Sequence, residues 1–367
     1  MCVLKRTLVA ALLGTVPLSV QAGELDPPGV PGSTTGPEPR IAINAVNTPG
    51  DSAAFHIISE PGSYHLAGNL INTDPNSPKH GIVIVSSDVS IDLNGFRVDG
   101  LDSLAPPGPQ PTAGILASID SGSLANITVR NGTVRDWNED GIDLSDVTGA
   151  RIVNILAANC GDTGIHVGER AVVTGCVGEE NGEFGIWAFT GSVVTECATA
   201  NNATAGFNIG GASIATHCTA FSNGNGFQIG EGCTVTECSA RSNAGHGIIS
   251  SANGSTIRGC TLRGNTGDGI RVNAGALILE NNCSFNGSGG DGAGINALST
   301  GCRIEGNSVV SNDRGIEVGD FGGSYIIRNT AQGNTTNYDI GSGNATGVIV
   351  TATEAITAIA PWANFEF

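Results

Sequence analysis

Residues that could do chemistry gather between positions 139 and 188. Asp140, Asp143 and Asp162 supply carboxylates, His166 can exchange protons near neutral pH, and Trp187 has an amphipathic ring that could stack on a sugar. Carboxylate oxygens are also the ligands that Ca²⁺ prefers, so Ca²⁺ is the one candidate cofactor, and nothing in the sequence requires it. The candidate roles are catalysis by His166, Asp143 and Asp162, substrate binding by Trp187 and Phe184, and Ca²⁺ binding by Asp140, Asp143 and Asp162.

A second candidate group consists of His246, Asp268 and Arg271. A histidine base close to a guanidinium that binds a carboxylate is the combination that lyase chemistry on uronic acids needs. These three residues are therefore candidate catalytic residues as well. The alternative is an ordinary surface ion pair between Asp268 and Arg271, which are three residues apart. No Ser-His-Asp arrangement and no phosphate-binding glycine loop is evident.

A sequence repeat determines whether these residues can meet. A glycine followed by an aliphatic or aromatic residue recurs at intervals of 20 to 25 residues. Each repeat is too small to bury its own apolar face, so neighbouring repeats must stack about 4.8 Å apart. The pairs are Gly141-Ile142, Gly164-Ile165, Gly185-Ile186, Gly206-Phe207, Gly226-Phe227, Gly247-Ile248, Gly269-Ile270, Gly294-Ile295 and Gly315-Ile316.

Short runs of alternating β-branched residues follow within each repeat, such as those at 172–174 and 193–195. Such runs, separated by Gly or Asn, predict short strands joined by tight turns. No stretch has sustained helical periodicity. We therefore predict an all-β chain, folded as a single-stranded right-handed parallel β-helix, a solenoid of about 12 coils.

The residue after each aliphatic one should point outward, because successive side chains of a strand alternate between its two faces. Stacking in register would then place Asp143, His166 and Trp187 on three consecutive coils. The full outward column is Leu116, Asp143, His166, Trp187, Asn208, Gln228, Ile249, Arg271, Asn296, Glu317 and Asp339.

Two further columns are predicted within the stack. Asparagines that precede the glycine pairs can hydrogen-bond from coil to coil and tolerate left-handed backbone angles. Cysteines stacked about 4.8 Å apart exceed the usual Cβ separation of a disulfide, about 3.5–4.5 Å, so we expect free thiols. The first column is Asn138, Asn159, Asn181, Asn202, Asn223, Asn243, Asn265, Asn286, Asn312 and Asn334. The second is Cys176, Cys197, Cys218, Cys238 and Cys260, with Asn131 before them and Asn281, Asn307 and Asn329 after them.

Composition and charge exclude several partners. The chain has 55 Gly in 367 residues and only 14% charged residues, against averages of about 7% and about 25% in soluble domains. Without Lys5 and Arg6 of the amino-terminal segment, 14 basic residues face 34 acidic ones, a net charge of −20. Nucleic acid is therefore excluded as a partner, because phosphate binding needs a basic surface. Neutral glycans, or acidic glycans bridged by cations, remain open.

The amino-terminal sequence predicts export. Lys5 and Arg6, a mostly apolar run at 7–20 and small residues before position 23 are typical of a signal peptide at 1–22. The apolar run is too short for a membrane span, so we expect no membrane insertion. A Pro- and Gly-rich linker should occupy 23–40, and the β-helix domain 41–367, with an amino-terminal cap at 41–70 and a carboxyl-terminal cap at 337–367. We expect a monomer that is secreted, periplasmic or at the cell surface.

The chain from about Arg40 resembles the right-handed β-helix repeat proteins, the pectate-lyase-like superfamily. The resemblance rests on the repeated Asn and Gly-Ile pattern and on the segment at 89–96, VSIDLNGF. The segments at 61–66, PGSYHL, and 361–365, PWANF, resemble an uncharacterised group of exported bacterial β-helix proteins. This resemblance implies a fold and export. The superfamily includes lyases, glycoside hydrolases, epimerases and adhesins, so it implies no single reaction.

A polygalacturonase-like site can be tested against the sequence. Residues 138–140 and 161–163 resemble two of that family's motifs, with Asp140 and Asp162 as their acids, and His246 resembles a third. Thr163 stands where a second Asp is expected, and Asn273 where a Lys is expected. His246 also lies about four coils beyond Asp162, near 19 Å, whereas paired carboxylates of glycosidases lie within about 5–9.5 Å. The motifs cannot form one such site.

Two functions remain. One is extracellular polysaccharide binding or modification along the outward column, and any enzyme would be a polysaccharide lyase, epimerase or glycoside hydrolase. The other is a noncatalytic structural or adhesion solenoid. Long loops walling a cleft would favour an enzyme, and only the stretches 101–112 and 283–294 add such length.

Overall fold

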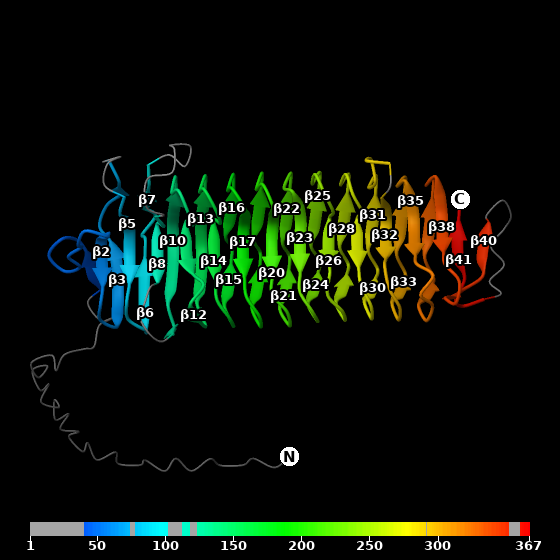
Figure 1. Ribbon diagram of the computed structural model, residues 1–367, viewed down its shortest axis with the longest axis horizontal. Helices are drawn as coiled ribbons and strands as arrows, with labels where there is room; N and C mark the ends of the chain where they lie inside the picture. Colours follow the sequence, from blue (N-terminus) through cyan, green and yellow to red (C-terminus); the bar gives the residue numbers. More distant parts are fainter. Residues whose placement is uncertain (1–39, 74–77, 102–111, 118–122, 291, 352–359) are drawn as a thin grey trace, which may run out of the picture. The chain divides into compact units, whose positions relative to one another are not determined.

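The computed structural model describes the unit that runs from Arg40 to Phe367. Its described residues form strands, turns and bends, and none of them lies in a helix. The strands stack as a right-handed parallel β-helix (Figure 1), so the predicted fold class is confirmed. The described residues are 40–73, 78–101, 112–117, 123–290, 292–351 and 360–367.

A sheet of 13 parallel strands runs along the stack, one strand from each turn. The structure therefore has 13 turns where the sequence predicts about 12 coils. The strands are β2 (Ala54–Ile58), β5 (His80–Ile84), β8 (Ile115–Ala117), β11 (Ile142–Leu144), β14 (Ile165–Val167), β17 (Phe184–Ala188), β20 (Ala205–Ile209), β23 (Asn225–Ile229), β26 (Ile248–Ser250), β29 (Ile270–Val272), β32 (Ala293–Ala297), β35 (Arg314–Val318) and β38 (Thr336–Ile340).

Each middle turn adds two more strands, which belong to a second, 26-stranded sheet. After β14, for example, the chain forms β15 (Val172–Thr174) and β16 (Val177–Glu179). These pair in parallel with β18 (Val193–Thr195) and β19 (Ala198–Ala200) of the next turn. Three short strands per turn explain the alternating apolar runs of the sequence.

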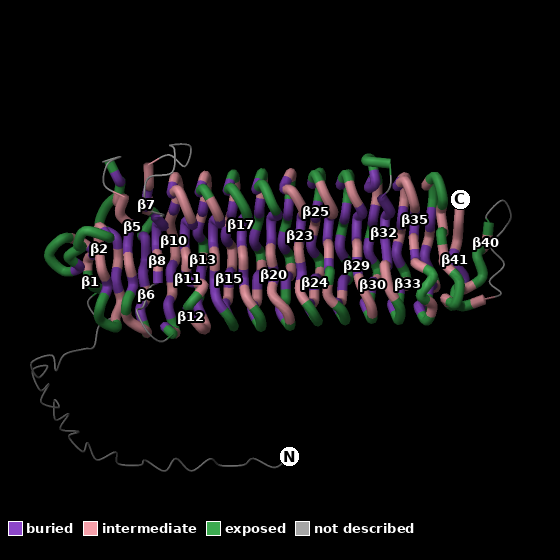
Figure 2. Tube along the Cα trace, in the orientation of Figure 1, coloured by how far each residue is buried: buried purple, intermediate pink, exposed green. Residues whose placement is uncertain are grey.

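The core fills the inside of the stack. The aliphatic or aromatic residue of each glycine pair points inward, and Ile142, Ile165 and Ile186 are fully buried. Phe207 and Phe227, one coil apart, stack with ring centroids 4.6 Å apart. Figure 2 shows buried positions recurring in every coil along the stack. Inward apolar side chains thus form one continuous core rather than one core per repeat.

The glycine of each pair is required because neighbouring coils approach closely at that point. A Cβ on Gly185 would lie 2.8 Å from the carbonyl oxygen of Gly206 and 2.8 Å from Nδ2 of Asn202. Real Cβ atoms do not approach backbone atoms so closely, so a larger residue would push two coils apart. The recurring glycine is therefore explained by packing between coils.

The asparagine column is a buried hydrogen-bond ladder. Nδ2 of Asn181 donates to Oδ1 of Asn202 at 2.9 Å, and the pattern continues to Asn334. Asn138 and Asn159 lie outside this ladder, but each still makes a hydrogen bond to the coil before it: Asn159 Nδ2 donates to Oδ1 of Asp136 at 2.6 Å, and Asn138 Oδ1 accepts the backbone N–H of Thr112 at 2.7 Å. Cys160 occupies the ladder position of its coil and donates its backbone N–H to Asn181, whereas Asn159 has φ 54° in the turn just before it. The left-handed position is thus one residue away from the ladder.

The cysteine column is buried as predicted, and the nine described cysteines are free. Asn281 continues it and accepts the backbone N–H of Cys260, followed by Asn307 and Asn329. Asn131 does not belong to it, because it has φ 59° and lies one residue before Gly132, which is aligned with the column. Outside this column, at the asparagine-ladder position, burial raises the pKa of Cys160 to about 12, which fits a thiol that packs as a small apolar group.

The two ends of the described unit differ. At the first turn, β1 (Ile41–Ile43) pairs with β3 (Gly62–Leu66). At the last turn, β41 (Asn364–Glu366) returns to pair with β37 (Thr330–Gln332) and β40 (Ile349–Thr351).

The boundaries predicted for the two caps are not tested and stay predictions. The predicted signal peptide and nearly all of the predicted linker lie outside the described residues. No described helix has the length and apolar character that crossing a membrane would take.

Candidate functional site

The outward column forms in the predicted register. Asp143 of β11 pairs with His166 of β14, and His166 pairs with Trp187 of β17. The column continues through Asn208 and Gln228, and later through Arg271, Asn296, Glu317 and Asp339. We call Asp140, Asp143, His166 and Trp187 the His166 patch, and His246, Asp268 and Arg271 the His246 cluster.

In the His166 patch, a buried carboxylate holds the imidazole. Oδ2 of Asp140 lies 3.1 Å from Nδ1 of His166, and Oδ1 of Asp143 lies 4.0 Å from the same nitrogen. The other oxygen of Asp140 accepts the backbone N–H of Thr163 at 2.8 Å. Burial raises the pKa of Asp140, and the hydrogen bond from His166 opposes that rise. Nδ1 of His166 therefore carries its proton toward Asp140, which leaves Nε2 with a free lone pair.

An aromatic cluster surrounds this imidazole. The Trp187 ring stacks on His166 at 4.2 Å between centroids and 9° between planes. Phe189 and Phe184 pack edge-on against Trp187 at 5.5 and 5.2 Å, and Phe184 is only 7% exposed. One face of Trp187 is therefore covered, and a sugar could reach only the face toward Asn208 or the ring edge.

Asp162 lies just before β14, close to a second acid, Glu183. Burial, and then the neighbouring Glu183 carboxylate, raise the pKa of Asp162. Glu139, one coil before it, also has a raised pKa, through burial and then through Asp140 and Asp143. The surroundings of His166 are therefore strongly acidic, and protons are retained there more readily than on isolated carboxylates.

The structure groups a set of possible metal ligands that differs from the predicted one. Asp140, Asp143 and His166 offer atoms that all lie within 4.8 Å of one another, whereas Asp162 is not part of this group. Two carboxylates with an imidazole suit Mn²⁺ or Zn²⁺ better than Ca²⁺, which prefers oxygen ligands alone. The donor atoms thus fit a divalent cation, with a chemistry that the sequence prediction did not anticipate.

The His246 cluster has a different arrangement. Oδ2 of Asp268 lies 3.3 Å from Nδ1 of His246 and 3.6 Å from Nη1 of Arg271. Nδ1 of His246 accepts the backbone N–H of Asp268 at 3.0 Å, so its proton is on Nε2. The Asp268 side chain is only 2% exposed, and Asn296 also reaches it at 3.5 Å. The predicted pair of Asp268 and Arg271 exists, but its acid is buried rather than on the surface.

A structural role of these acids was missed by sequence reasoning. Oδ1 of Asp140, of Asn225 and of Asp268 each accepts the backbone N–H of the residue one coil later, at Thr163, His246 and Ala293. We call these positions, two residues before the inward aliphatic one, the capping column. An Asp or Asn directly before the glycine pair of a repeat is the sequence signal that could have revealed this column. In the two acids, Asp140 and Asp268, one oxygen accepts this backbone N–H and the other contacts neighbouring side chains.

The two groups are too far apart to act together. β14 and β29 are five strands apart in the 13-stranded sheet, or about 24 Å at the spacing of parallel strands. His246, just before β26, is four strands beyond β14. The structure brings together Asp140, Asp143, His166, Trp187 and Phe184, and separately His246, Asp268 and Arg271.

Comparisons with known proteins agree on the architecture. The fold resembles the Azotobacter vinelandii mannuronan C-5 epimerase AlgE6 A-module, with 16% identity, 83% of this chain and 87% of that chain covered, and a TM-score of 0.54. It also resembles a mutant tailspike protein of E. coli bacteriophage HK620 in complex with a hexasaccharide (11% identity, 85% and 71% covered, TM-score 0.46). A third neighbour is DFA-IIIase from Arthrobacter chlorophenolicus A6 without its lid (14%, 75% and 83%, TM-score 0.39). At such identities the likeness concerns the fold alone.

No curated protein matches the sequence. The profile of the family described as "Right handed beta helix region" does match it, over residues 81–236 and 213–335. These two matches span most of the described turns, and their strands are the ones that carry both the His166 patch and the His246 cluster. The chain therefore belongs to the right-handed β-helix family.

Proposed function

We propose that the chain binds a polysaccharide along the outward column of the 13-stranded sheet, centred on the His166 patch. One observation carries this proposal. Among the described residues, seven buried side-chain N or O atoms lack a hydrogen-bond partner, and three of them belong to residues 162–166, the stretch that carries His166: Asp162 Oδ1, Thr163 Oγ1 and His166 Nε2. Unpartnered buried polar atoms are rare and costly in proteins. A ligand rich in hydroxyl groups could satisfy them, provided that a neighbouring aromatic ring moves aside to expose His166 Nε2.

The scaffold suits a repeating ligand. The outward column offers one side chain per rung, at about 4.8 Å spacing, and neighbouring rungs supply Asn208 and Gln228 after Trp187. Strands are rigid, so these groups are held in place before a ligand arrives. The fold shared with a mannuronan epimerase module is compatible with a polysaccharide ligand. Export of the chain, which the segment 1–22 supports, would place it where such polymers occur.

A glycan array on the wild type and on Trp187→Ala tests this proposal. Removing the ring should weaken binding by about 1–3 kcal/mol, the scale of aromatic burial and stacking. Phe221→Ala is the matched control, because Phe221 is 44% exposed on a strand of the other sheet. If the wild type binds no glycan, or if both Trp187→Ala and the control bind like the wild type, the structural solenoid becomes the better account.

Catalysis is a second candidate function, and the contact between Asp140 and His166 favours it. A carboxylate that orients an imidazole leaves the distal nitrogen able to accept a proton, as general base catalysis requires. Nε2 is buried here, so a substrate would have to displace a neighbouring ring. We expect His166→Gln to abolish any turnover of a polysaccharide panel while retaining binding. Release of reducing ends and formation of unsaturated uronates are the measurements, and turnover by His166→Gln would refute this role.

A divalent cation could bridge an acidic glycan to this acidic surface. We propose Asp140 and Asp143 as its carboxylate ligands, with Nδ1 of His166 as the third donor, whose proton the cation would displace to Nε2 or to solvent. Binding to the array should then be compared with Ca²⁺, with Mn²⁺ and with a chelator. Asp143→Asn should abolish any cation dependence and leave the melting temperature without cation nearly unchanged, because Asp143 is only half-buried. Cation-dependent binding that survives Asp143→Asn would exclude this ligand set.

A further inference from the structure

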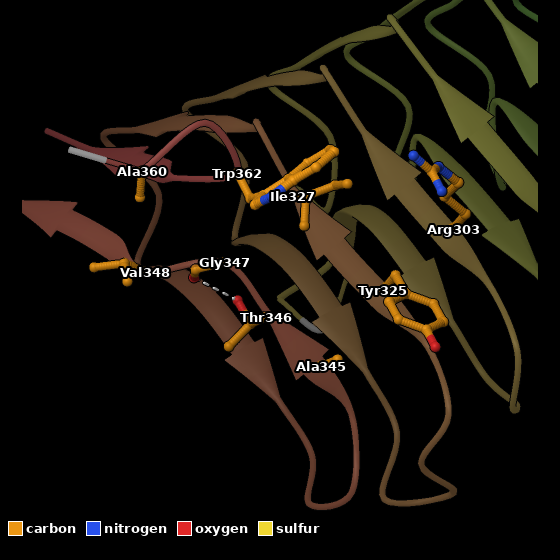
Figure 3. Close-up of a pocket in the computed structure, with 9 residues that line it drawn as sticks. All are labelled: Arg303, Tyr325, Ile327, Ala345, Thr346, Gly347, Val348, Ala360 and Trp362. Atoms are coloured by element: carbon orange, nitrogen blue, oxygen red, sulfur yellow. Dashed lines mark hydrogen bonds between the residues drawn. The ribbon is translucent and has the colours of Figure 1, made fainter. Parts of the chain in front are cut away.

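A second aromatic feature lies on the other sheet, near the last turns. A cavity of about 480 Å³ is lined by residues of β33 (Arg303–Glu305), β36 (Tyr325–Ile327) and β39 (Ala345–Thr346), and by the returning segment around Trp362. Its volume falls within the range of small-molecule sites, about 300–1,000 Å³. Figure 3 shows Trp362 over Ile327 on one side and Tyr325 on the other.

Tyr325 has an open ring face, in contrast to Trp187. In its outward column Tyr325 pairs with Arg303 on one side and with Ala345 on the other. Because Ala345 has only a methyl group, the neighbouring rung leaves space beside the Tyr325 ring, which is 57% exposed. Trp187 has His166 stacked on one face and a longer side chain, Asn208, on the next rung. The column thus provides a vacant stacking surface at Tyr325.

Trp362 is held in place although it is 50% exposed. Its carbonyl oxygen lies where a Cβ on Gly347 would be, so the returning segment packs directly on that glycine. The Arg328 guanidinium covers one ring face at 4.5 Å, and its Nε donates to the carbonyl of Pro361 at 2.9 Å. A large aromatic ring that is exposed and fixed loses little conformational entropy when a ligand binds. Trp362 is a preorganised wall of the cavity.

The charges around the cavity are already paired. Both Nε and Nη2 of Arg303 contact Oε2 of Glu305, at 2.7 and 2.6 Å, and Nη1 of Arg328 contacts Oε1 of the same residue at 3.0 Å. An anionic ligand would have to compete with Glu305 for both guanidinium groups. The remaining surface is mostly apolar, with the Tyr325 hydroxyl and Thr346 as polar groups, and the cavity is shallow and widely open to solvent. A ligand with a flat apolar face and hydroxyl groups at its rim matches it.

We propose that this cavity binds a neutral saccharide, with a pyranose ring stacked on Tyr325 over Ala345 and against Trp362. This site is on the 26-stranded sheet, so it is independent of the His166 patch and does not rest on the function proposed above. Two separate saccharide sites on different sheets would allow the chain to hold one polymer at two points or to bridge two polymers.

The test is saturation-transfer NMR of the full chain with cellohexaose, laminarihexaose and mannohexaose, and with hexagalacturonate as the acidic comparison. We expect at least one neutral hexasaccharide to bind, and Ala345→Phe to weaken it at least tenfold by filling the space beside Tyr325. Ala345 is exposed, so this variant should fold. Tyr325→Ala should weaken binding to a similar degree and provides a second variant that removes bulk instead of adding it.

Controls separate this site from others. Phe321→Ala removes a 69% exposed ring near the same end that does not line the cavity, and Trp187→Ala removes the ring of the His166 patch. Both should leave hexasaccharide binding unchanged. The proposal is overturned if no neutral hexasaccharide binds, if binding survives both Ala345→Phe and Tyr325→Ala, or if Trp187→Ala alone removes it. It is also overturned if sedimentation shows a dimer of the wild type that Tyr325→Ala converts to a monomer, because a second copy of the chain would then cover this surface.

Discussion

The His166 patch and the His246 cluster use the same two columns of the same sheet, and they place their histidines differently. His166 occupies the outward column, so its Nδ1 faces the free oxygen of Asp140 from the preceding coil. His246 occupies the capping column, so its Nδ1 accepts a backbone N–H of the next coil. One imidazole is left with an acceptor nitrogen and the other with a donor. The position of a histidine within the coil therefore determines which chemistry it can offer.

The largest expected effect is the loss of stability when the buried acid of the His246 cluster is removed. Asp268→Ala leaves the backbone N–H of Ala293 without its 2.7 Å acceptor and removes the partner of Arg271 and Asn296. We expect the free energy of unfolding to fall by about 2–3 kcal/mol. Urea denaturation measures it. Asp268→Asn keeps the capping oxygen and should cost much less, and equal losses in the two variants would contradict the capping role.

The equivalent change in the His166 patch should be smaller. Asp140→Ala removes the acceptor for the backbone N–H of Thr163 and the partner of His166. Burial raises the pKa of Asp140, and its charged form is also repelled by Asp143, so part of the loss is regained. We expect a decrease of about 1–2 kcal/mol by the same measurement. A larger loss of stability than for Asp268→Ala would contradict the expectation that Asp268, with more partners, contributes more to the fold than Asp140.

Replacing Asp162 should stabilise the chain, in contrast to the two substitutions above, and the gain should depend on pH. Its pKa is raised in the folded chain by burial and by Glu183, so folding favours the protonated form. That contribution is present below the ordinary Asp titration at about pH 3.9 and is lost as the pH rises through the raised value. Asp162→Asn should therefore stabilise the chain at pH 7 by about 0.2–1 kcal/mol, the scale of like charges on neighbouring strands. The gain should vanish at pH 3, and a gain of equal size at both values would contradict this account.

The tautomers of His166 and His246 involve the smallest difference in free energy, but they test the contrast between the two groups most directly. Nitrogen chemical shifts from NMR distinguish the two neutral tautomers of a histidine. We expect the Nδ1–H form for His166 and the Nε2–H form for His246. Asp140→Asn should reduce the Nδ1–H population of His166 and leave His246 unchanged. The same tautomer in both residues of the wild type would remove the distinction between the two regions.

Residue spacing predicted the register of the outward column correctly along its whole length, from Leu116 to Asp339. It failed by one residue at Asn131 and Asn159, because a left-handed turn residue directly precedes each ladder position and both positions accept asparagine. It also missed the covered face of Trp187 and the cation set of Asp140, Asp143 and His166. Those features depend on which side chains from neighbouring coils meet, and the repeat does not specify side-chain orientation.

The sequence by itself determined the architecture. A glycine that admits the neighbouring coil and an inward apolar residue recur along the repeats, a buried amide joins them from Asn181 onward, and each requires the next coil to complete its contacts. Only the tertiary structure decided the chemistry. Which oxygen of Asp140 caps a backbone N–H, which nitrogen of His166 holds the proton, and whether an aromatic ring faces a neighbour or an empty rung are set by contacts between coils. Such contacts join residues about 20 positions apart, where local sequence patterns carry no information on side-chain geometry.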